Sequence, residues 1–357
     1  MENTASVRID LSALRTNLRV VRTLCPDSRI MAMVKADAYG HGLVPVARAL
    51  RDADGLAVAR LQEALSLRAA GITHRILLLG TLLEPSDVAL CSQQQIDVTA
   101  HDALSVAAIM AQAREYPLRV WLKLDSGMHR MGLPPGAFVD ADHQLAAHPG
   151  VSELIHMTHF SCAGEAARSV TRQQMDCFAS CHGTDSRIPV SMANSAALLT
   201  TPQTRTGWVR PGIMLYGSSP VGLQPEIRLQ AVMSLRSRIV ALRDIEGGEA
   251  VGYNRRWVSA RPSRIATVGI GYGDGYPRHA GNGTPVWVNG RTLPLVGQVS
   301  MDSLTVDVTD CPRVSIGDEV ILWGRELSAE TIAEYAGTIA YELFTSLQTR
   351  VTREYSS

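Results

Sequence analysis

IMAMVKADAYGHG, residues 30–42, is the stretch that decides how the rest of the chain is interpreted. Its first five residues are apolar, which is typical of a buried strand, and the glycines at 40 and 42 indicate a turn into a helix. Lys35 directly follows the apolar run, so we expect its amine to lie in a dry opening at the strand end. Desolvation favours the neutral amine, which can attack a carbonyl and form a Schiff base. An exposed lysine is the alternative that position alone leaves open.

Short apolar runs alternate with helix-like segments between residues 29 and 210. Eight such runs over about two hundred residues predict an α/β fold, a parallel (β/α)8 barrel of the TIM type. An open doubly wound sheet is the alternative, but no Gly-x-Gly-x-x-Gly sequence follows the first run to favour it. The predicted strands are 29–34, 56–59, 76–79, 96–98, 120–124, 154–158, 188–191 and 208–210.

The pattern changes after residue 225, where alternating β-type runs are separated by turn signals. Asn289-Gly290 between two such runs is typical of a hairpin. Residues 328–336 are expected to form a short helix. The sequence therefore predicts two domains: a barrel over residues 1–225 and a mostly β domain over residues 226–357.

Composition limits the possible partners. The formal net charge is zero and no basic stripe is present, so nucleic acid is not an expected partner. The N-terminal residues lack an apolar signal core and no stretch approaches a membrane span, so we expect a cytoplasmic protein that does not bind a membrane. Cys177, Cys181 and His182 could suggest a metal, but reduced thiols on a helix are the simpler interpretation, and no metal is expected.

Several polar and charged side chains follow predicted strands. Catalytic groups of a (β/α)8 barrel lie at the carboxyl ends of its strands, so these side chains are expected to meet at one mouth. The candidates are Lys35, Lys123, Arg130, His159, Asn194, Ser195 and Arg210.

Two segments resemble those of a known family. Residues 34–42, VKADAYGHG, resemble the segment of alanine racemases that binds pyridoxal 5′-phosphate (PLP), with Asp37 where that family usually has Asn. Residues 208–217, WVRPGIMLYG, resemble the family segment whose arginine faces the cofactor ring. The resemblance extends over essentially the whole chain. It implies a PLP-dependent alanine racemase in which Lys35 holds the cofactor.

The resemblance also implies roles around the cofactor. Arg210 would donate to the pyridine nitrogen, and because arginine keeps its proton, the ring would stay neutral and disfavour transamination. His159 would support Arg210. Asn194 and Ser195 begin a short helix, where simple capping is the alternative to ligand binding. The residues implied to hold the phosphate are Tyr39, Ser195, Gly212, Ile213 and Tyr341.

Lys123 and Arg130 form an awkward pair of like charges in a buried setting. The family resolves this by carbamylating the matching lysine, and the resemblance implies the same modification of Lys123. The resulting anion would orient Arg130 toward the substrate carboxylate and the cofactor hydroxyl.

Inversion needs a second proton carrier on the opposite face of the substrate. By resemblance Tyr253 is that carrier, Met301 binds the substrate carboxylate through its backbone N–H, and Tyr272 narrows the entrance. These residues belong to the β domain, which in the family reaches the barrel mouth of the other subunit. The implied assembly is a head-to-tail homodimer with shared sites.

The predicted function is interconversion of L-alanine and D-alanine by a two-base mechanism, which supplies D-alanine for peptidoglycan or allows its catabolism. A racemase of broader specificity, for example for serine, remains an alternative. A basic-amino-acid decarboxylase on the same barrel would meet the ring nitrogen with a carboxylate, so Arg210 argues against it. A PLP carrier without turnover would lack the β half of the chain.

Overall fold

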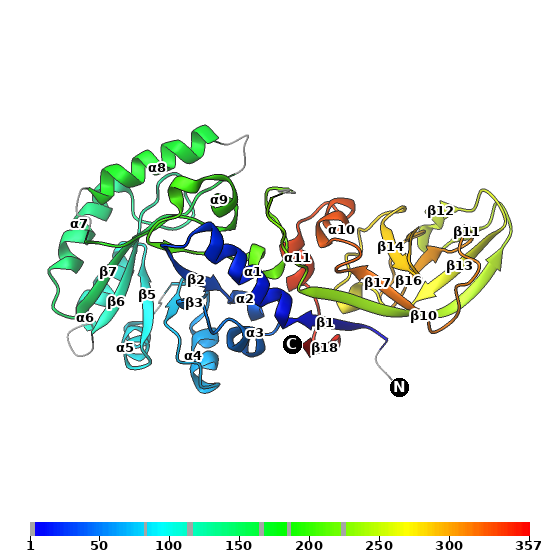
Figure 1. Ribbon diagram of the computed structural model, residues 1–357, viewed down its shortest axis with the longest axis horizontal. Helices are drawn as coiled ribbons and strands as arrows, with labels where there is room; N and C mark the ends of the chain where they lie inside the picture. Colours follow the sequence, from blue (N-terminus) through cyan, green and yellow to red (C-terminus); the bar gives the residue numbers. More distant parts are fainter. Residues whose placement is uncertain (1–3, 82–83, 113–116, 164–167, 184–186, 223–225) are drawn as a thin grey trace.

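A computed structural model describes residues 4–81, 84–112, 117–163, 168–183, 187–222 and 226–357. Figure 1 shows two bodies side by side, a barrel with helices around it and a β-rich domain. None of the helices in these ranges is both long enough and apolar enough to cross a membrane.

The first body is built on an eight-stranded sheet whose order is β8-β7-β6-β5-β4-β3-β2-β9, with every recorded pair parallel. An isolated parallel bridge between Asn194 and Arg210 joins the two ends of this order just beyond β8 and β9. The predicted (β/α)8 barrel is confirmed, and the open doubly wound sheet is wrong. The strands are β2 Arg29–Met33, β3 Gly55–Val58, β4 Ile76–Leu78, β5 Ile96–Ala100, β6 Leu118–Lys123, β7 Val151–Met157, β8 Val190–Ser191 and β9 Trp208–Val209.

Helices follow the strands along the chain and cover the outside of the barrel (Figure 1). β3, β4 and β5 are buried at every position, as expected for strands covered on both faces. The helices are α1 Leu11–Leu24, α3 Leu43–Ala49, α4 Leu61–Ala69, α5 Pro85–Gln93, α6 Ala103–Gln112, α7 Pro135–Ala146, α8 Arg168–His182 and α9 Ser195–Thr200.

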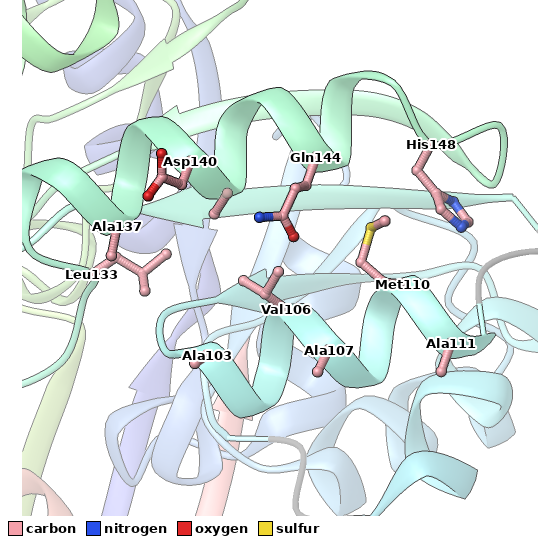
Figure 2. Close-up of a pocket in the computed structure, with 11 residues that line it drawn as sticks. Ala103, Val106, Ala107, Met110, Ala111, Leu133, Ala137, Asp140, Gln144 and His148 are labelled. Carbon is pink, nitrogen blue, oxygen red and sulfur yellow. The ribbon is translucent and has the colours of Figure 1, made fainter.

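A shallow groove of about 600 Å³ runs between α6 and α7. Figure 2 shows Val106 and Met110 pointing from α6 toward α7, and Gln144 pointing back from α7. The other lining residues are five alanines, at positions 103, 107, 111, 137 and 141, together with Leu133, Asp140 and His148. The groove lies on the outer layer of the barrel, apart from the strand ends.

The second body is a mostly antiparallel sheet, as predicted. β14 and β15 form a hairpin through Asn289 and Gly290, whose φ angles of 47° and 81° suit the expected two-residue turn. The predicted helix over 328–336 is present as α10 Ala329–Tyr335. The strands of this region are β10 Met233–Ile245, β11 Ala250–Val251, β12 Trp257–Val258, β13 Ser263–Val268, β14 Pro285–Val288, β15 Arg291–Pro294, β16 Leu304–Asp307 and β17 Glu319–Trp323.

The N-terminal strand belongs to this second sheet. β1 Ser6–Asp10 pairs antiparallel with β10 and parallel with β18 Thr352–Ser356. β1 falls in the range 1–225, but it lies outside the barrel because both of its partners, β10 and β18, belong to the second sheet. The predicted boundary touches residues 223–225, which lie outside the described residues, and the division of the chain there stays a prediction.

The C-terminal part of the chain also returns to the barrel. α11 Ala340–Thr345 lies between the two bodies in Figure 1 and packs against the segment after β2. The rings of Tyr39 and Tyr341 are 5.9 Å apart, and those of His41 and Phe344 are 5.2 Å apart. One wall of the barrel mouth is thus made by residues from the end of the chain.

Candidate functional site

A cavity of about 1010 Å³ opens at the carboxyl ends of the barrel strands. In the described single chain, every predicted site residue except Tyr253, Tyr272 and Met301 lines it. The roles of these residues stay predictions, but their convergence is a property of the fold. The predicted residues that line the cavity are Lys35, Tyr39, Lys123, Arg130, His159, Asn194, Ser195, Arg210, Gly212, Ile213 and Tyr341.

The backbone that follows Lys35 is left-handed. Ala36, Asp37, Ala38 and Tyr39, within α2 Lys35–Tyr39, have φ angles of 53° to 54°. Such a conformation costs an L-residue roughly 1–2 kcal/mol, so four in a row need support from the surrounding structure. The sequence predicted a strand-to-helix turn here, and the structure forms a left-handed turn before α3 begins.

Two contacts show how this turn is held at its far end. Gly40 has φ 77°, and a Cβ there would lie 2.0 Å from the carbonyl oxygen of Phe344, so only glycine fits. Asp37 Oδ1 accepts a hydrogen bond from the backbone N–H of Leu43 at 2.8 Å. An asparagine could offer the same acceptor, which explains why Asp37 fits where the resembling family usually has Asn.

Lys35 is partly buried at the floor of the cavity. Burial lowers the pKa of its amine, the positive charge of Arg130 lowers it further, and the carboxylate of Glu63 opposes the shift. The direction is the one that a nucleophilic lysine needs, because only the neutral amine carries a free electron pair.

Arg210 is almost fully buried and held by backbone and hydroxyl acceptors. Its Nη1 donates to Ser191 Oγ, and its Nη2 donates to the carbonyl oxygen of Thr158 at 2.6 Å. Burial lowers its pKa to about 10, which leaves the guanidinium charged at neutral pH. Ser191 closes the predicted strand 188–191, and its position at a strand end was the signal by which the sequence could have marked it.

His159 lies beside this arginine. Burial, followed by the charge of Arg210, lowers the pKa of its ring to about 3, so the imidazole is neutral at pH 7. The terminal nitrogens of Arg210 donate to Ser191 and Thr158 rather than to His159, so support by His159 stays a prediction.

Lys123 ends β6 inside the same cavity. Burial and the charges of Arg210 and Arg130 lower the pKa of its amine to about 8. A substantial fraction of this lysine is therefore neutral near physiological pH. A neutral amine is the form that reacts with carbon dioxide.

One end of the cavity presents hydroxyl groups. Burial raises the pKa of Tyr39 and raises that of Tyr341 to about 12, so both phenols keep their protons. Ser195 Oγ accepts from the backbone N–H of Gly212 at 2.8 Å. A Cβ at Gly212 would lie 2.6 Å from the Tyr39 hydroxyl, so a side chain there would fill the space.

Asn194 has a structural role as well as a place in the cavity wall. Its Oδ1 accepts from the backbone N–H of Ala197 at 2.9 Å and caps α9. Asn194 therefore caps a helix, which was the structural alternative to ligand binding. It places the hydroxyl of the next residue, Ser195, at the hydroxyl-lined end.

The donor set fits PLP. An amine of lowered pKa can hold the aldehyde, a fixed guanidinium can face the pyridine nitrogen, and a cluster of protonated hydroxyls can hold a phosphate. The space kept open by Gly212 lies among those hydroxyls.

Tyr253, Tyr272 and Met301 lie on the β domain instead. Their side chains are 67 %, 37 % and 54 % exposed. Tyr253 begins a short 3-10 turn between β11 and β12, and Tyr272 begins another after β13. A single chain does not bring these residues to the cavity.

Glu63 and Tyr216 were not identified from the sequence as residues that support the site. Glu63 lies in the first turn of α4, where an acidic residue is ordinary helix chemistry. Tyr216 stacks on Tyr39 at 4.9 Å between ring centroids and donates to the carbonyl oxygen of Met33. No sequence pattern marked either residue as part of the site, because each contacts residues that only the folded structure brings close to it.

Comparison with known proteins gives consistent results. Residues 9–220 match the family model described as alanine racemase, N-terminal domain, and residues 232–355 match alanine racemase, C-terminal domain. The chain is 46% identical to a biosynthetic alanine racemase of Pseudomonas aeruginosa, over 98% of each chain. It is also 46% identical to a catabolic alanine racemase of Pseudomonas putida, over 98% of each chain.

The fold agrees with the sequence matches. The crystal structure of the biosynthetic alanine racemase from Pseudomonas aeruginosa superposes with a TM-score of 0.95 at 44% identity. That match covers 99% of this chain and 100% of the other.

Proposed function

The chain belongs to the alanine racemase family, and from this premise we propose that it interconverts L-alanine and D-alanine with PLP as its cofactor. The observation that carries the proposal is the cavity in which Lys35, of lowered pKa, meets a fixed arginine and a set of protonated hydroxyls. A decarboxylase would be expected to place a carboxylate where Arg210 lies.

The residues of the cavity would hold the cofactor at three points. Lys35 would hold its aldehyde group, and Arg210 would donate to its ring nitrogen. The hydroxyls of Tyr39, Ser195 and Tyr341, with the backbone of Gly212 and Ile213, bind its phosphate. When bound, PLP supplies an electron-withdrawing group that acidifies the Cα–H bond of an amino acid joined to it.

Two bases then work from opposite faces. The neutral amine of Lys35 would remove or return the Cα proton on the D-side. Tyr253 of a second copy of the chain does so on the L-side. Racemisation follows because the proton leaves from one face and returns to the other.

Other residues select and orient the substrate. Arg130 and the backbone N–H of Met301 bind the carboxylate, and carbamylated Lys123 orients Arg130. Tyr272 narrows the entrance and favours a side chain as small as a methyl group.

The proposed assembly is a head-to-tail homodimer, and the exposure of Tyr253, Tyr272 and Met301 on the β domain of the described chain supports it. We place the enzyme in the cytoplasm. Run toward D-alanine the reaction supplies peptidoglycan, and run in reverse it feeds catabolism. The equal identity to a biosynthetic and a catabolic relative does not separate these roles.

The test is proton exchange in deuterated water. The purified protein with PLP is incubated with L-alanine, and loss of the α-proton is followed together with chirality. We expect deuterated L- and D-alanine to appear together. L-serine and L-lysine in the same assay define the specificity, and release of carbon dioxide would instead support a decarboxylase.

The control is Lys35→Ala, which should lose both exchange and the absorption of the lysine-bound cofactor. A wild-type protein that stays colourless after PLP is added would contradict the proposal. Retained absorption in the variant would mean that another lysine holds the ring.

A further inference from the structure

The left-handed turn after Lys35 needs support at its start as well as at Gly40. Ala36 is the first residue of that turn, and it is exposed. Its conformation is therefore not fixed by packing of its own side chain. A strained backbone of this kind persists only where outside contacts determine it.

Glu63 supplies those contacts. Its Oε1 accepts a hydrogen bond from the backbone N–H of Ala36 at 2.6 Å. Its Oε2 accepts from the N–H groups of Ala59 and Arg60, both at 2.9 Å. One carboxylate thus joins the residue after Lys35 to the residues just beyond β3 and to the first turn of α4.

Hydrogen bonds to a charged acceptor are about twice as strong as neutral ones. All three donors are backbone groups, and two of them, Ala59 and Arg60, lie between the end of β3 and the start of α4. The carboxylate therefore transmits the rigid geometry of β3 and α4 to the turn that carries Lys35.

Glu63 also supplies a negative charge. The cations and bases that face the Lys35 amine from the rest of the cavity are Arg130, Lys123 and His159. Arg130 disfavours the charged form of Lys35, whereas Glu63 favours it. The carboxylate thus limits how far the basicity of this amine falls.

We propose that Glu63 is a positioning residue for Lys35: its carboxylate holds the left-handed turn in place, and its negative charge favours the protonated form of the nitrogen that would hold the cofactor. The inference rests on the proposed function, in which that nitrogen is both the anchor and a proton carrier. Glu63 itself is not among the residues that line the cavity.

The first variant is Glu63→Gln, which keeps the shape but removes the charge. An amide has one acceptor oxygen, so it can keep either the bond to Ala36 or the bonds to Ala59 and Arg60. In the holoenzyme we expect the pH midpoint of the cofactor–lysine absorption to fall by about one unit, because a cationic nitrogen loses a nearby anion. We expect kcat to fall about tenfold with KM within about twofold, because no substrate contact is lost.

The second variant, Glu63→Asp, distinguishes the effect of side-chain length from the effect of the negative charge. It keeps the carboxylate but is one methylene too short to reach Ala36 and β3 together. It should lower kcat about as much as Glu63→Gln, while its pH midpoint should stay closer to that of the wild type.

A third readout does not depend on the cofactor. Hydrogen exchange of peptides covering residues 33–42 should speed up in both Glu63 variants, because the turn loses its restraint. The matched control is Asp10→Asn, which removes another helix-capping carboxylate, bonded to Ser12 and Ala13 at the start of α1. It should leave midpoint, kcat and exchange at residues 33–42 unchanged.

Wild-type midpoint, kcat and exchange in Glu63→Gln would overturn the inference, as would equal changes in Asp10→Asn. Failure of the proposed function is distinct from this outcome, because the wild type would then show no cofactor–lysine absorption at all. The exchange measurement would still decide whether Glu63 holds the turn.

Discussion

Single residues in the cavity are tuned by burial beside other cations. Lys123 shows this most clearly, because burial and two arginines bring the pKa of its amine to about 8. Reaction of the neutral amine with carbon dioxide forms an N–C bond and releases one proton. The product is an anion, which turns the repulsion by Arg130 and Arg210 into attraction.

We therefore expect Lys123 to be carbamylated in the purified protein. With ¹³C-labelled bicarbonate, carbon NMR should show a carbamate resonance that is missing from a Lys123→Met variant. The variant should also bind alanine more weakly, because Arg130 loses its orienting partner. An unmodified Lys123 amine in wild-type protein saturated with bicarbonate would contradict the prediction.

Tyr253 gives an asymmetric prediction. Tyr253→Phe would remove the proposed proton carrier from one face only, so racemisation from L-alanine should fall about 100-fold or more. Exchange of the α-proton of D-alanine with deuterated water should fall much less, because Lys35 remains. Equal losses in the two assays would argue against two bases on opposite faces.

At the scale of elements, the segment after β2 is stabilised by a buried aromatic cluster. His41 is fully buried, and its Nδ1–H donates to the carbonyl oxygen of Tyr39 at 2.8 Å. Its ring lies 4.5 Å from that of Tyr216. Burial lowers its pKa from 6.5 to about 4, so the folded protein keeps this ring neutral.

This shift predicts how stability depends on pH. In the unfolded chain His41 becomes protonated below pH 6.5, whereas in the folded chain it becomes protonated only near pH 4. The free energy of unfolding should therefore fall as pH drops through this window, by up to about 3 kcal/mol from this residue, and be unaffected above it.

Urea unfolding at pH 8, 6.5 and 5 measures the effect. His41→Asn keeps an N–H near the position of Nδ1 but cannot titrate, so its stability should decline less between pH 6.5 and pH 5. His159, whose pKa is also lowered by burial, is present in both proteins and cancels in the comparison. The same pH dependence in both would refute the assignment to His41.

The elements also show what the sequence could predict. Each barrel strand is a short apolar run, so local pattern was enough to find it and to place Lys35, Lys123 and Arg210 at one rim. The left-handed turn was not predictable, because every residue in it acts against its own local preference. Glu63, which bonds to the first residue of this turn, and Phe344, whose backbone leaves room only for a glycine at position 40, lie in other elements. The pairing of β1 with β10 likewise joins segments that are remote in sequence.

At the scale of the whole molecule, the proposed site is divided between two copies of the chain. The cavity has Lys35 but no contribution from Tyr253, Tyr272 or Met301, which are exposed on the β domain of the described chain. Two copies placed head to tail would complete both sites, since one symmetry operation supplies each cavity with the other's β domain.

Mixing two inactive variants tests this assembly. Lys35→Ala and Tyr253→Ala should each be inactive alone. After unfolding and refolding together, mixed dimers contain one site with both residues intact, so about a quarter of the wild-type activity should return. Mass spectrometry of the intact dimers checks that the copies have exchanged. Exchange without recovered activity would mean that the two residues do not share a site across chains.

The pairing of β1 with β10 and β18 governs the order of events during synthesis. β1 precedes the whole barrel along the chain, whereas its antiparallel partner β10 and its parallel partner β18 both follow the barrel. A polypeptide released after the barrel but before β10 would therefore carry a first strand without either of these partners, and its open edge would be a site for association with other chains.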